Sequence, residues 1–216
     1  MSLVYTEIII KGEPFYLLPQ KAAYRPLQKQ LILSDIHLGK ASHFRKQGIA
    51  MPPQSHLRDI DRIHFLIDKY NPETVLLLGD LFHSEYNNEW LWFKSMLMTY
   101  PRVQFVLLEG NHDILPRGTY VIPNLMKIGL LEEQYIIFSH HPLSDQRKLN
   151  ICGHVHPGIK VSGKARESVT LPCFAMSETH FIMPAFGDLT GLSMINIREQ
   201  QRIFVALSDS VVEIDF

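Results

Sequence analysis

Three short apolar runs in the first half of the chain are each bounded by polar residues and predict buried strands, at residues 31–33, 75–78 and 103–108. The two stretches between them carry apolar residues at spacings of three and four, which is the pattern of an amphipathic helix. These positions are Ile60, Ile63, Leu66 and Ile67 in the first stretch and Trp90, Leu91, Phe93, Met96 and Leu97 in the second. Ser55 and Asn88 are predicted as caps near the helix starts, and Pro101 closes the second helix. This alternation predicts crossover connections and parallel strand pairing.

The pattern changes after about residue 134, where short apolar or alternating runs are separated by turn residues such as Pro157-Gly158. Such runs predict strands joined by hairpins. The predicted strands cover residues 135–138, 159–161, 169–174, 181–184, 194–197, 202–207 and 211–214, with two more at 5–10 and 15–18. The fold class is therefore α/β, with two packed β-sheets flanked by helices. Because no repeat or long linker interrupts the chain, residues 1–216 are interpreted as a single domain.

Composition narrows the class of protein only slightly. Hydrophobic residues make up 46% of the chain and charged residues 20%, as in ordinary folded proteins. The net charge of -1 argues against general coating of nucleic acid but leaves room for a local basic patch. Two cysteines without a CxxC pair favour a reducing cytoplasm. No leader and no long apolar run is recognised, so neither export nor a membrane partner is expected.

Five clusters of polar residues each follow an apolar run, and they carry most of the functional information. They are Asp35 with His37, Asp80 with His83, Asn111 to Asp113, His140 with His141, and His154 with His156. One such pair alone would be better interpreted as a polar loop. Five clusters, each after an apolar run, instead favour a shared binding site, because ligands gather beyond the carboxyl ends of strands in open α/β sheets. Unpaired buried charges are costly, so converging Asp, Asn and His side chains predict a metal site.

The order Asp-x-His, Gly-Asp-x-x-His, Gly-Asn-His-Asp, His and Gly-His-x-His resembles the motifs of calcineurin-like metallophosphoesterases. The resemblance implies that family's two-sheet β-sandwich with helices, its active site at the carboxyl ends of strands, and two divalent ions. One ion would be held by Asp35, His37, Asp80 and His156, and the other by Asp80, Asn111, His140 and His154. His141 is the alternative to His140. The same resemblance makes His112 a proton donor outside the metal shell and Asp113 the carboxylate that orients it.

Three further segments, residues 35–49, 171–174 and 184–191, resemble the DNA ligase-associated (PdeM-type) metallophosphoesterases. That narrower resemblance implies a bacterial phosphodiesterase or nuclease linked to DNA repair and encoded near a ligase or helicase. Imidazole, carboxylate and amide ligands without thiolate suit Mn²⁺, Fe or Zn²⁺, and the resemblance favours Mn²⁺. Cys152 and Cys173 are interpreted as buried strand thiols.

The predicted activity is two-metal phosphodiester hydrolysis, because two divalent ions can bind the ester oxygens and lower the pKa of water toward about 7. Lys40, Arg45 and Lys46 follow the first motif and are candidates for binding substrate phosphates, with a solvated helix face as the alternative. Nucleic acid or a related phosphodiester is the expected substrate, and the family resemblance favours DNA. A phosphatase or phosphodiesterase for small molecules or nucleotides is the competing enzyme interpretation. A non-catalytic adaptor is disfavoured by the complete ligand set. A homodimer is compatible with the sequence, although no residue argues for it.

Overall fold

The computed structural model describes residues 4–50, 57–83, 88–113, 120–144, 147–162 and 168–216. Its first sheet runs in the order β1-β2-β3-β4-β5-β6-β7. The strands are β1 (Thr6–Ile10), β2 (Glu13–Leu18), β3 (Ala22–Arg25), β4 (Gln30–Leu33), β5 (Thr74–Leu77), β6 (Gln104–Leu108) and β7 (Leu125–Ile128). Strands β1 to β4 pair antiparallel, whereas β4 to β7 pair parallel. The predicted parallel pairing is confirmed, and β3 and β7 are strands that the sequence pattern did not predict.

The second sheet runs β14-β11-β12-β13-β10-β9-β8, and β15 joins it by pairing with β12 and β16. Its strands are β8 (Leu131–Glu132), β9 (Ile136–Ser139), β10 (Leu149–Cys152), β11 (Pro157–Ser162), β12 (Ser168–Met176), β13 (His180–Ile182), β14 (Ser193–Met194), β15 (Arg202–Ala206) and β16 (Val211–Ile214). The hairpin prediction is correct for β11–β12 and β15–β16, which are antiparallel. It is also correct for β12–β13, which are antiparallel. The sequence pattern did not predict β10, which lies between β9 and β13 and pairs parallel with both.

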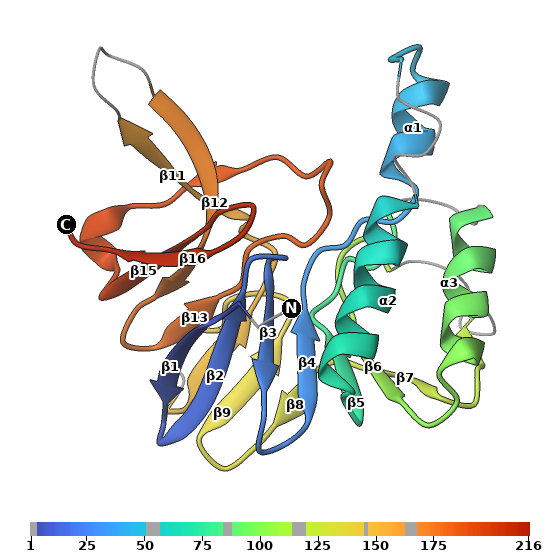
Figure 1. The fold of residues 1–216 in the computed structure, drawn as a ribbon, viewed down its shortest axis with the longest axis horizontal. Helices are drawn as coiled ribbons and strands as arrows, with labels where there is room; N and C mark the ends of the chain where they lie inside the picture. The colour runs from blue at the N-terminus through green and yellow to red at the C-terminus, as the bar shows by residue number, and fades with distance from the viewer. Residues whose placement is uncertain (1–3, 51–56, 84–87, 114–119, 145–146, 163–167) are drawn as a thin grey trace.

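Two helices, α2 (Arg58–Tyr70) and α3 (Asn88–Thr99), connect the parallel strands and cover one face of the first sheet (Figure 1). Asn88 is the first residue of α3. The N-cap of α2 is Leu57, which offers no side-chain hydrogen bond, and the predicted cap Ser55 lies outside the described residues. The short helix α1 (Lys40–Lys46) begins after Gly39, whose φ is 91°. Within the described residues, no helix is long and apolar enough to span a membrane.

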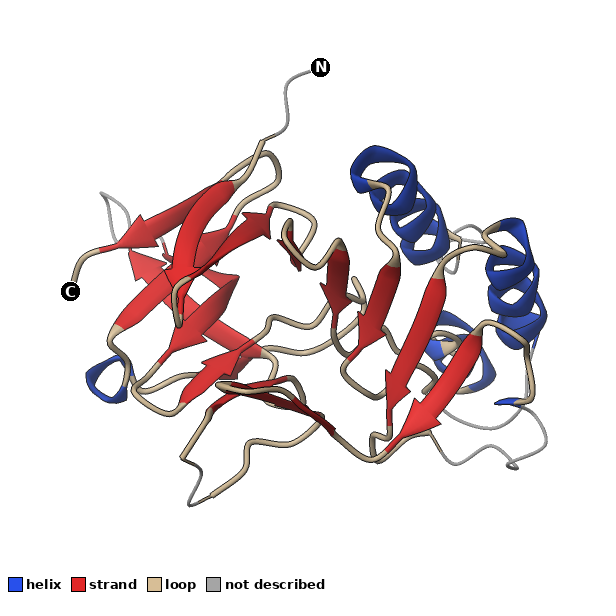
Figure 2. Ribbon diagram, turned by 90° about the horizontal axis from the view of Figure 1, so that it is seen from below, coloured by secondary structure: helices blue, strands red, loops and turns tan. Residues whose placement is uncertain are grey.

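The molecule has three layers, with the helices on one side of the first sheet and the second sheet on the other (Figure 2). A hydrophobic core lies on each face of the first sheet. Alternate residues of one strand pack into these two cores, because successive side chains of a strand point to opposite faces. Leu31 and Leu33 pack toward the helices, and Ile32 between them packs toward the second sheet. This double burial explains why the central strands read as unbroken apolar runs.

Candidate metal centre

The five predicted clusters lie in five loops that follow β4, β5, β6, β9 and β10, and these loops meet at one end of the two sheets. Backbone hydrogen bonds join neighbouring loops directly. Asp35 N donates to Gly79 O at 3.2 Å, and His37 N donates to Asp80 O at 2.9 Å. Gly153 N donates to His140 O at 3.0 Å. The strand order therefore brings together side chains that are more than a hundred residues apart in sequence.

Five of the predicted ligand residues adopt the left-handed backbone region. The φ values are 51° at Asp35, 52° at His37, 48° at Asp80, 65° at His154 and 52° at His156. Residues other than glycine rarely adopt this region, and such strain gathers at functional sites, where the surrounding structure holds it in place. The neighbouring loops leave no room for larger residues, since a Cβ at Gly79 would lie 2.4 Å from Nδ1 of His140.

Asp35, His37 and His156 form the first half-site, with their ligand atoms within 4.8 Å of one another. Asp35 is fully buried, and its Oδ2 accepts hydrogen bonds from the Ser34 hydroxyl and from His154 N. Its Oδ1 accepts no hydrogen bond of good geometry and lies 3.3 Å from Nε2 of His156. Burial lowers the pKa of His37 to about 3, so its imidazole is in the neutral form that binds metals. A divalent cation fits this donor set.

His140, His141 and His154 form the second half-site. Nδ1 of His140 donates to Leu78 O at 2.9 Å, which leaves its Nε2 free, at 3.2 Å from Nδ1 of His154. A hydrogen bond of this kind fixes the tautomer of a metal-binding histidine. Nε2 of His141 lies 2.7 Å from Oδ1 of Asn111, which comes from the loop after β6. Burial lowers the pKa of both His141 and His154, again favouring neutral imidazoles. Both candidate histidines, His140 and His141, therefore belong to this cluster.

Asp80 lies between the two half-sites and is 3% exposed. Its Oδ2 is 3.7 Å from Nε2 of His37 in the first half-site. Its Oδ1 is 3.5 Å from Nε2 of His140 in the second half-site and also accepts a hydrogen bond from His112 N at 2.9 Å. Each oxygen of this one carboxylate thus faces a different group of histidines.

His112 groups with His37 and Asp80, and its Nδ1 lies 3.2 Å from the backbone oxygen of His83. Because a carbonyl oxygen only accepts, Nδ1 carries a proton in this contact. The Asp113 carboxylate, to which the family resemblance gave the orienting role, has other partners. It accepts hydrogen bonds from Leu81 N at 3.0 Å and Gly110 N at 2.9 Å. Burial raises the pKa of Asp113. The partner of His112 Nδ1 is therefore the backbone oxygen of His83, whereas the resemblance implied the Asp113 carboxylate.

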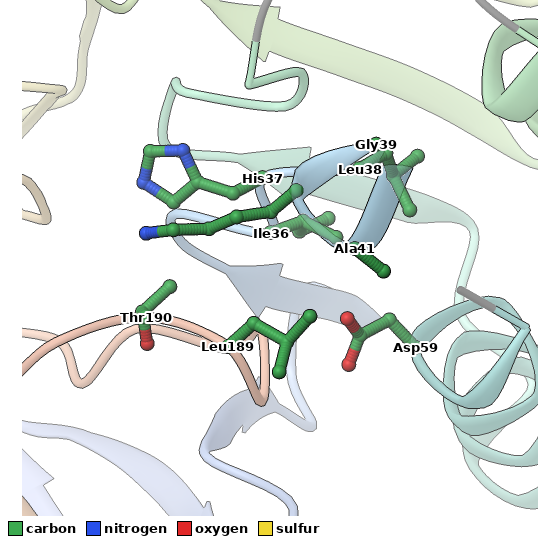
Figure 3. A pocket seen from close by; sticks show the side chains of 9 residues that line it. Ile36, His37, Leu38, Gly39, Ala41, Asp59, Leu189 and Thr190 are labelled. Atoms are coloured by element: carbon green, nitrogen blue, oxygen red, sulfur yellow. The ribbon is translucent and has the colours of Figure 1, made fainter. Parts of the chain in front are cut away.

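Of the three predicted phosphate-binding residues, Lys40 lies beside the site. It lines a pocket together with His37, Leu189 and Thr190, at the start of α1 (Figure 3). Burial lowers the pKa of Lys40, and the charge of Asp80 opposes that shift. Arg45 is exposed, and its Nη2 donates to the Ser42 hydroxyl at 3.0 Å. The side chain of Lys46 lies outside the described part of the structure.

Some residues that build the site carried no prediction of their own. Ser34, which donates to Asp35, is buried, and its place between the apolar run at residues 31–33 and Asp35 is the sequence signal for this role. The segment at residues 186–190 belongs to a stretch that resembled the narrower family, yet no role was assigned to it. Its Phe186 N donates to Ser34 O at 2.7 Å, and its Gly187 N donates to Asp35 O at 3.2 Å. Cys152 and Cys173 are buried free thiols in β10 and β12, as the sequence indicated.

The fold and the clustered His and Asp residues are those of a metal-dependent phosphoesterase, and the chain belongs to the calcineurin-like phosphoesterase family, whose sequence model matches residues 29–171. The chain is similar in structure to the nuclease MPE of Pseudomonas putida, with 23% sequence identity, a TM-score of 0.79, and coverage of 97% of this chain and 100% of that one. A weaker similarity, with 13% identity and a TM-score of 0.45, links 86% of the chain to 97% of YfcE, a phosphoesterase from E. coli. No curated protein matches the sequence.

Proposed function

We propose that this chain is a two-metal phosphodiesterase that cleaves nucleic-acid strands. The observation that carries the proposal is the position of Asp80, with Oδ2 toward His37 and Oδ1 toward His140. One ion is assigned to Asp35, His37, Asp80 and His156, and the other to Asp80, Asn111, His140 and His154. Two divalent ions held there would supply Lewis-acid chemistry, polarising the ester and lowering the pKa of water.

The chain's own residues then divide the remaining work. His112 is assigned as the proton donor in its imidazolium form. Its Nδ1–H donates to the His83 carbonyl, and the proton on Nε2 passes to the departing alkoxide, which leaves the neutral imidazole. Asp113 holds the loop that carries His112 by accepting the amides of Leu81 and Gly110. Lys40 is assigned to the substrate phosphate, since its ammonium group lies near the ligands and its partial burial limits screening of its charge.

We assign Mn²⁺ as the preferred ion, with Fe or Zn²⁺ as the alternatives. The donor set is rich in imidazole and contains no thiolate. Mg²⁺ retains its water and favours oxygen ligands, so histidine-rich half-sites suit it poorly. After removal of metal, Mn²⁺ is therefore expected to restore more activity than Mg²⁺, and equal restoration by the two ions would contradict the assignment.

The choice of nucleic acid as substrate has two supports. One structural relative is a nuclease, and the segments at residues 35–49, 171–174 and 184–191 resemble ligase-associated enzymes. The same resemblance motivates a link to DNA repair and a ligase or helicase as partner. Action in the cytoplasm is proposed from the two cysteines, which form no CxxC pair. Residues 1–216 are taken as one domain, and a homodimer stays a prediction.

Turnover of four substrates tests the proposal: bis-p-nitrophenyl phosphate, p-nitrophenyl phosphate, cyclic nucleotides and single-stranded DNA, each with Mn²⁺ and with chelator. We expect metal-dependent cleavage of the three diesters, which are bis-p-nitrophenyl phosphate, the cyclic nucleotides and single-stranded DNA. DNA cleavage should weaken as salt rises, because contacts with a polymer release counterions, whereas a mononucleotide scarcely does. Preference for the monoester, or for cyclic nucleotides without salt dependence, would favour a small-molecule phosphoesterase.

A further inference from the structure

Four charged side chains, Lys21, Asp59, Arg62 and Asp188, form a cluster behind the first half-site, which we call the Arg62 bracket. Nη1 of Arg62 lies 2.7 Å from Oδ1 of Asp188, and Nη2 lies 2.8 Å from Oδ1 of Asp59. Nη2 also donates to the backbone oxygen of Phe186, and the guanidinium carbon lies 4.1 Å from the centre of the Phe186 ring. Arg62 thus ties helix α2 to the segment at residues 186–190 through three contacts, and its pair with Asp59 lies within α2.

Lys21, from the turn between β2 and β3, reinforces the same connection. Its Nζ donates to Gly187 O at 3.2 Å and lies 3.3 Å from Oδ1 of Asp188. The side chains of Lys21 and Arg62 are only 14% and 19% exposed, so solvent screens these charge contacts weakly. The bracket therefore clamps residues 186–190 from two elements, helix α2 and the turn between β2 and β3.

The clamped segment packs directly against the backbone of the first metal loop. Phe186 N and Gly187 N donate to the carbonyls of Ser34 and Asp35. A Cβ at Gly187 would lie 2.3 Å from Ile36 O, so the two backbones touch with no side chain between them. Leu189 and Thr190, at the end of the segment, face the same pocket as His37 (Figure 3). Within the described part of the chain, no hydrogen bond joins residues 186–190 to the second half-site.

We propose that Arg62 is a positioning residue for the ion of the first half-site, an inference that rests on the two-metal function proposed above. The strained φ values of Asp35 and His37 persist only while neighbouring structure holds them. Without Arg62, residues 186–190 lose the contacts that press them against this loop, and the loop relaxes. Affinity for the first ion falls by about 10- to 100-fold, the usual effect of removing an outer partner of a metal ligand, and the second half-site keeps its ion.

The test compares Arg62→Ala with a matched control, Arg202→Ala, by titrating metal-free protein with Mn²⁺ and recording electron paramagnetic resonance spectra. Arg202 also pairs with a carboxylate, that of Glu213 at 2.6 Å, and lies over an aromatic ring, that of Phe204 at 4.7 Å. Two Mn²⁺ ions that share a carboxylate are spin-coupled, whereas a single bound ion gives an isolated spectrum. Wild type and Arg202→Ala should give the coupled spectrum at the same free Mn²⁺ concentration. Arg62→Ala should bind one ion first and couple only at about 10- to 100-fold higher free Mn²⁺.

Two further variants keep the test decisive. Arg62→Lys retains the charge but not the planar fork, so its affinity should be intermediate. Should Arg62→Ala lack native circular dichroism in chelator, Lys21→Met decides by the same spectra, because it removes the contact with Gly187 O. If folded Arg62→Ala or Lys21→Met gave the coupled spectrum at the same Mn²⁺ concentration as wild type, the positioning role would be overturned. The two-metal proposal would be unaffected by that result. A wild-type protein that never gives the coupled spectrum would overturn the two-metal proposal and this inference with it.

Discussion

The two half-sites differ in how firmly the structure holds them. Asp35 and His37 of the first half-site are buried, and hydrogen bonds from neighbouring loops fix their backbone. In the second half-site, His140 is buried, but His141 and His154 are exposed, as is Asn111, which contacts His141. Rigid support of ligands lowers the cost of organising a site when the ion binds. We therefore expect the ligands of the first half-site to be the more rigidly organised of the two sets before an ion binds.

Packing, and not strand order, explains the difference, because the strands that precede both half-sites lie inside their sheets. Residues 186–190 pack against the loop after β4, which belongs to the first half-site. Asn111 and His141 instead meet across two loops through a single side-chain contact. The second half-site is thus the open, more exposed side of the centre.

The largest effect is expected for Asp80→Ala, which removes the carboxylate that faces both half-sites. Both ions should be lost or bound weakly, and turnover should fall to that of chelator-treated protein. Metal content by elemental analysis and turnover of bis-p-nitrophenyl phosphate measure this. Asp209→Ala, which alters an exposed carboxylate, is the control. If the Asp80 variant retained two ions at wild-type affinity, the shared-ligand assignment would be wrong.

Replacement of His112 should separate chemistry from metal binding. His112→Asn should keep both ions, while turnover falls by roughly 10²- to 10⁴-fold, the usual contribution of a positioned proton donor. The loss should be greater for alkyl leaving groups than for p-nitrophenolate, which leaves without a proton. His154→Asn should instead release the ion of the second half-site. Loss of metal from the His112 variant, or equal losses with both kinds of leaving group, would exclude the general-acid role.

The sequence predicted the parallel strands and the clusters at their ends because both depend on local patterns. The pairing of β10 was not predictable in this way, since nothing within Leu149–Cys152 specifies that β9 and β13 will be its neighbours. The partner of His112 was equally hidden. Asp113 is adjacent in sequence, yet its carboxylate accepts the amides of Leu81 and Gly110. Contacts between distant segments, such as that of Arg62 with Asp188, need the three-dimensional structure.

A smaller effect should distinguish the hydroxyl groups behind the two half-sites. Ser34→Ala removes a donor to Oδ2 of Asp35 and should lower the affinity of the first ion by about 10- to 100-fold. Ser139→Ala is the counterpart, because the Ser139 hydroxyl donates to the backbone oxygen of His141 at 2.6 Å and not to a ligand atom. Its effect on the second ion should be smaller. Mn²⁺ titration of both variants measures this, and a larger loss in Ser139→Ala would reverse the proposed order of rigidity.

The smallest effect concerns Asp59, which lines the pocket beside the first half-site (Figure 3). Burial raises its pKa from 3.8 to about 6, although the charge of Arg62 opposes the shift. The folded protein thus holds this proton more tightly than the unfolded chain does. The resulting contribution to the free energy of unfolding is fully present below pH 3.8 and is lost as the pH rises through about 6. At 1.36 kcal/mol per pKa unit, it amounts to at most about 3 kcal/mol.

Asp59→Asn does not titrate at this position, so the wild type should lose stability relative to the variant as the pH rises from about 4 to 7. Urea unfolding of both proteins in chelator, at unit steps of pH, measures the difference. Asp61→Asn, an exposed position on the same helix, is the control and should show little dependence. A wild-type-to-variant difference that stays constant across this range would mean that Asp59 ionises normally. The buried side of the centre would then tolerate charge as readily as the open side, and the contrast between the half-sites would lose one of its physical causes.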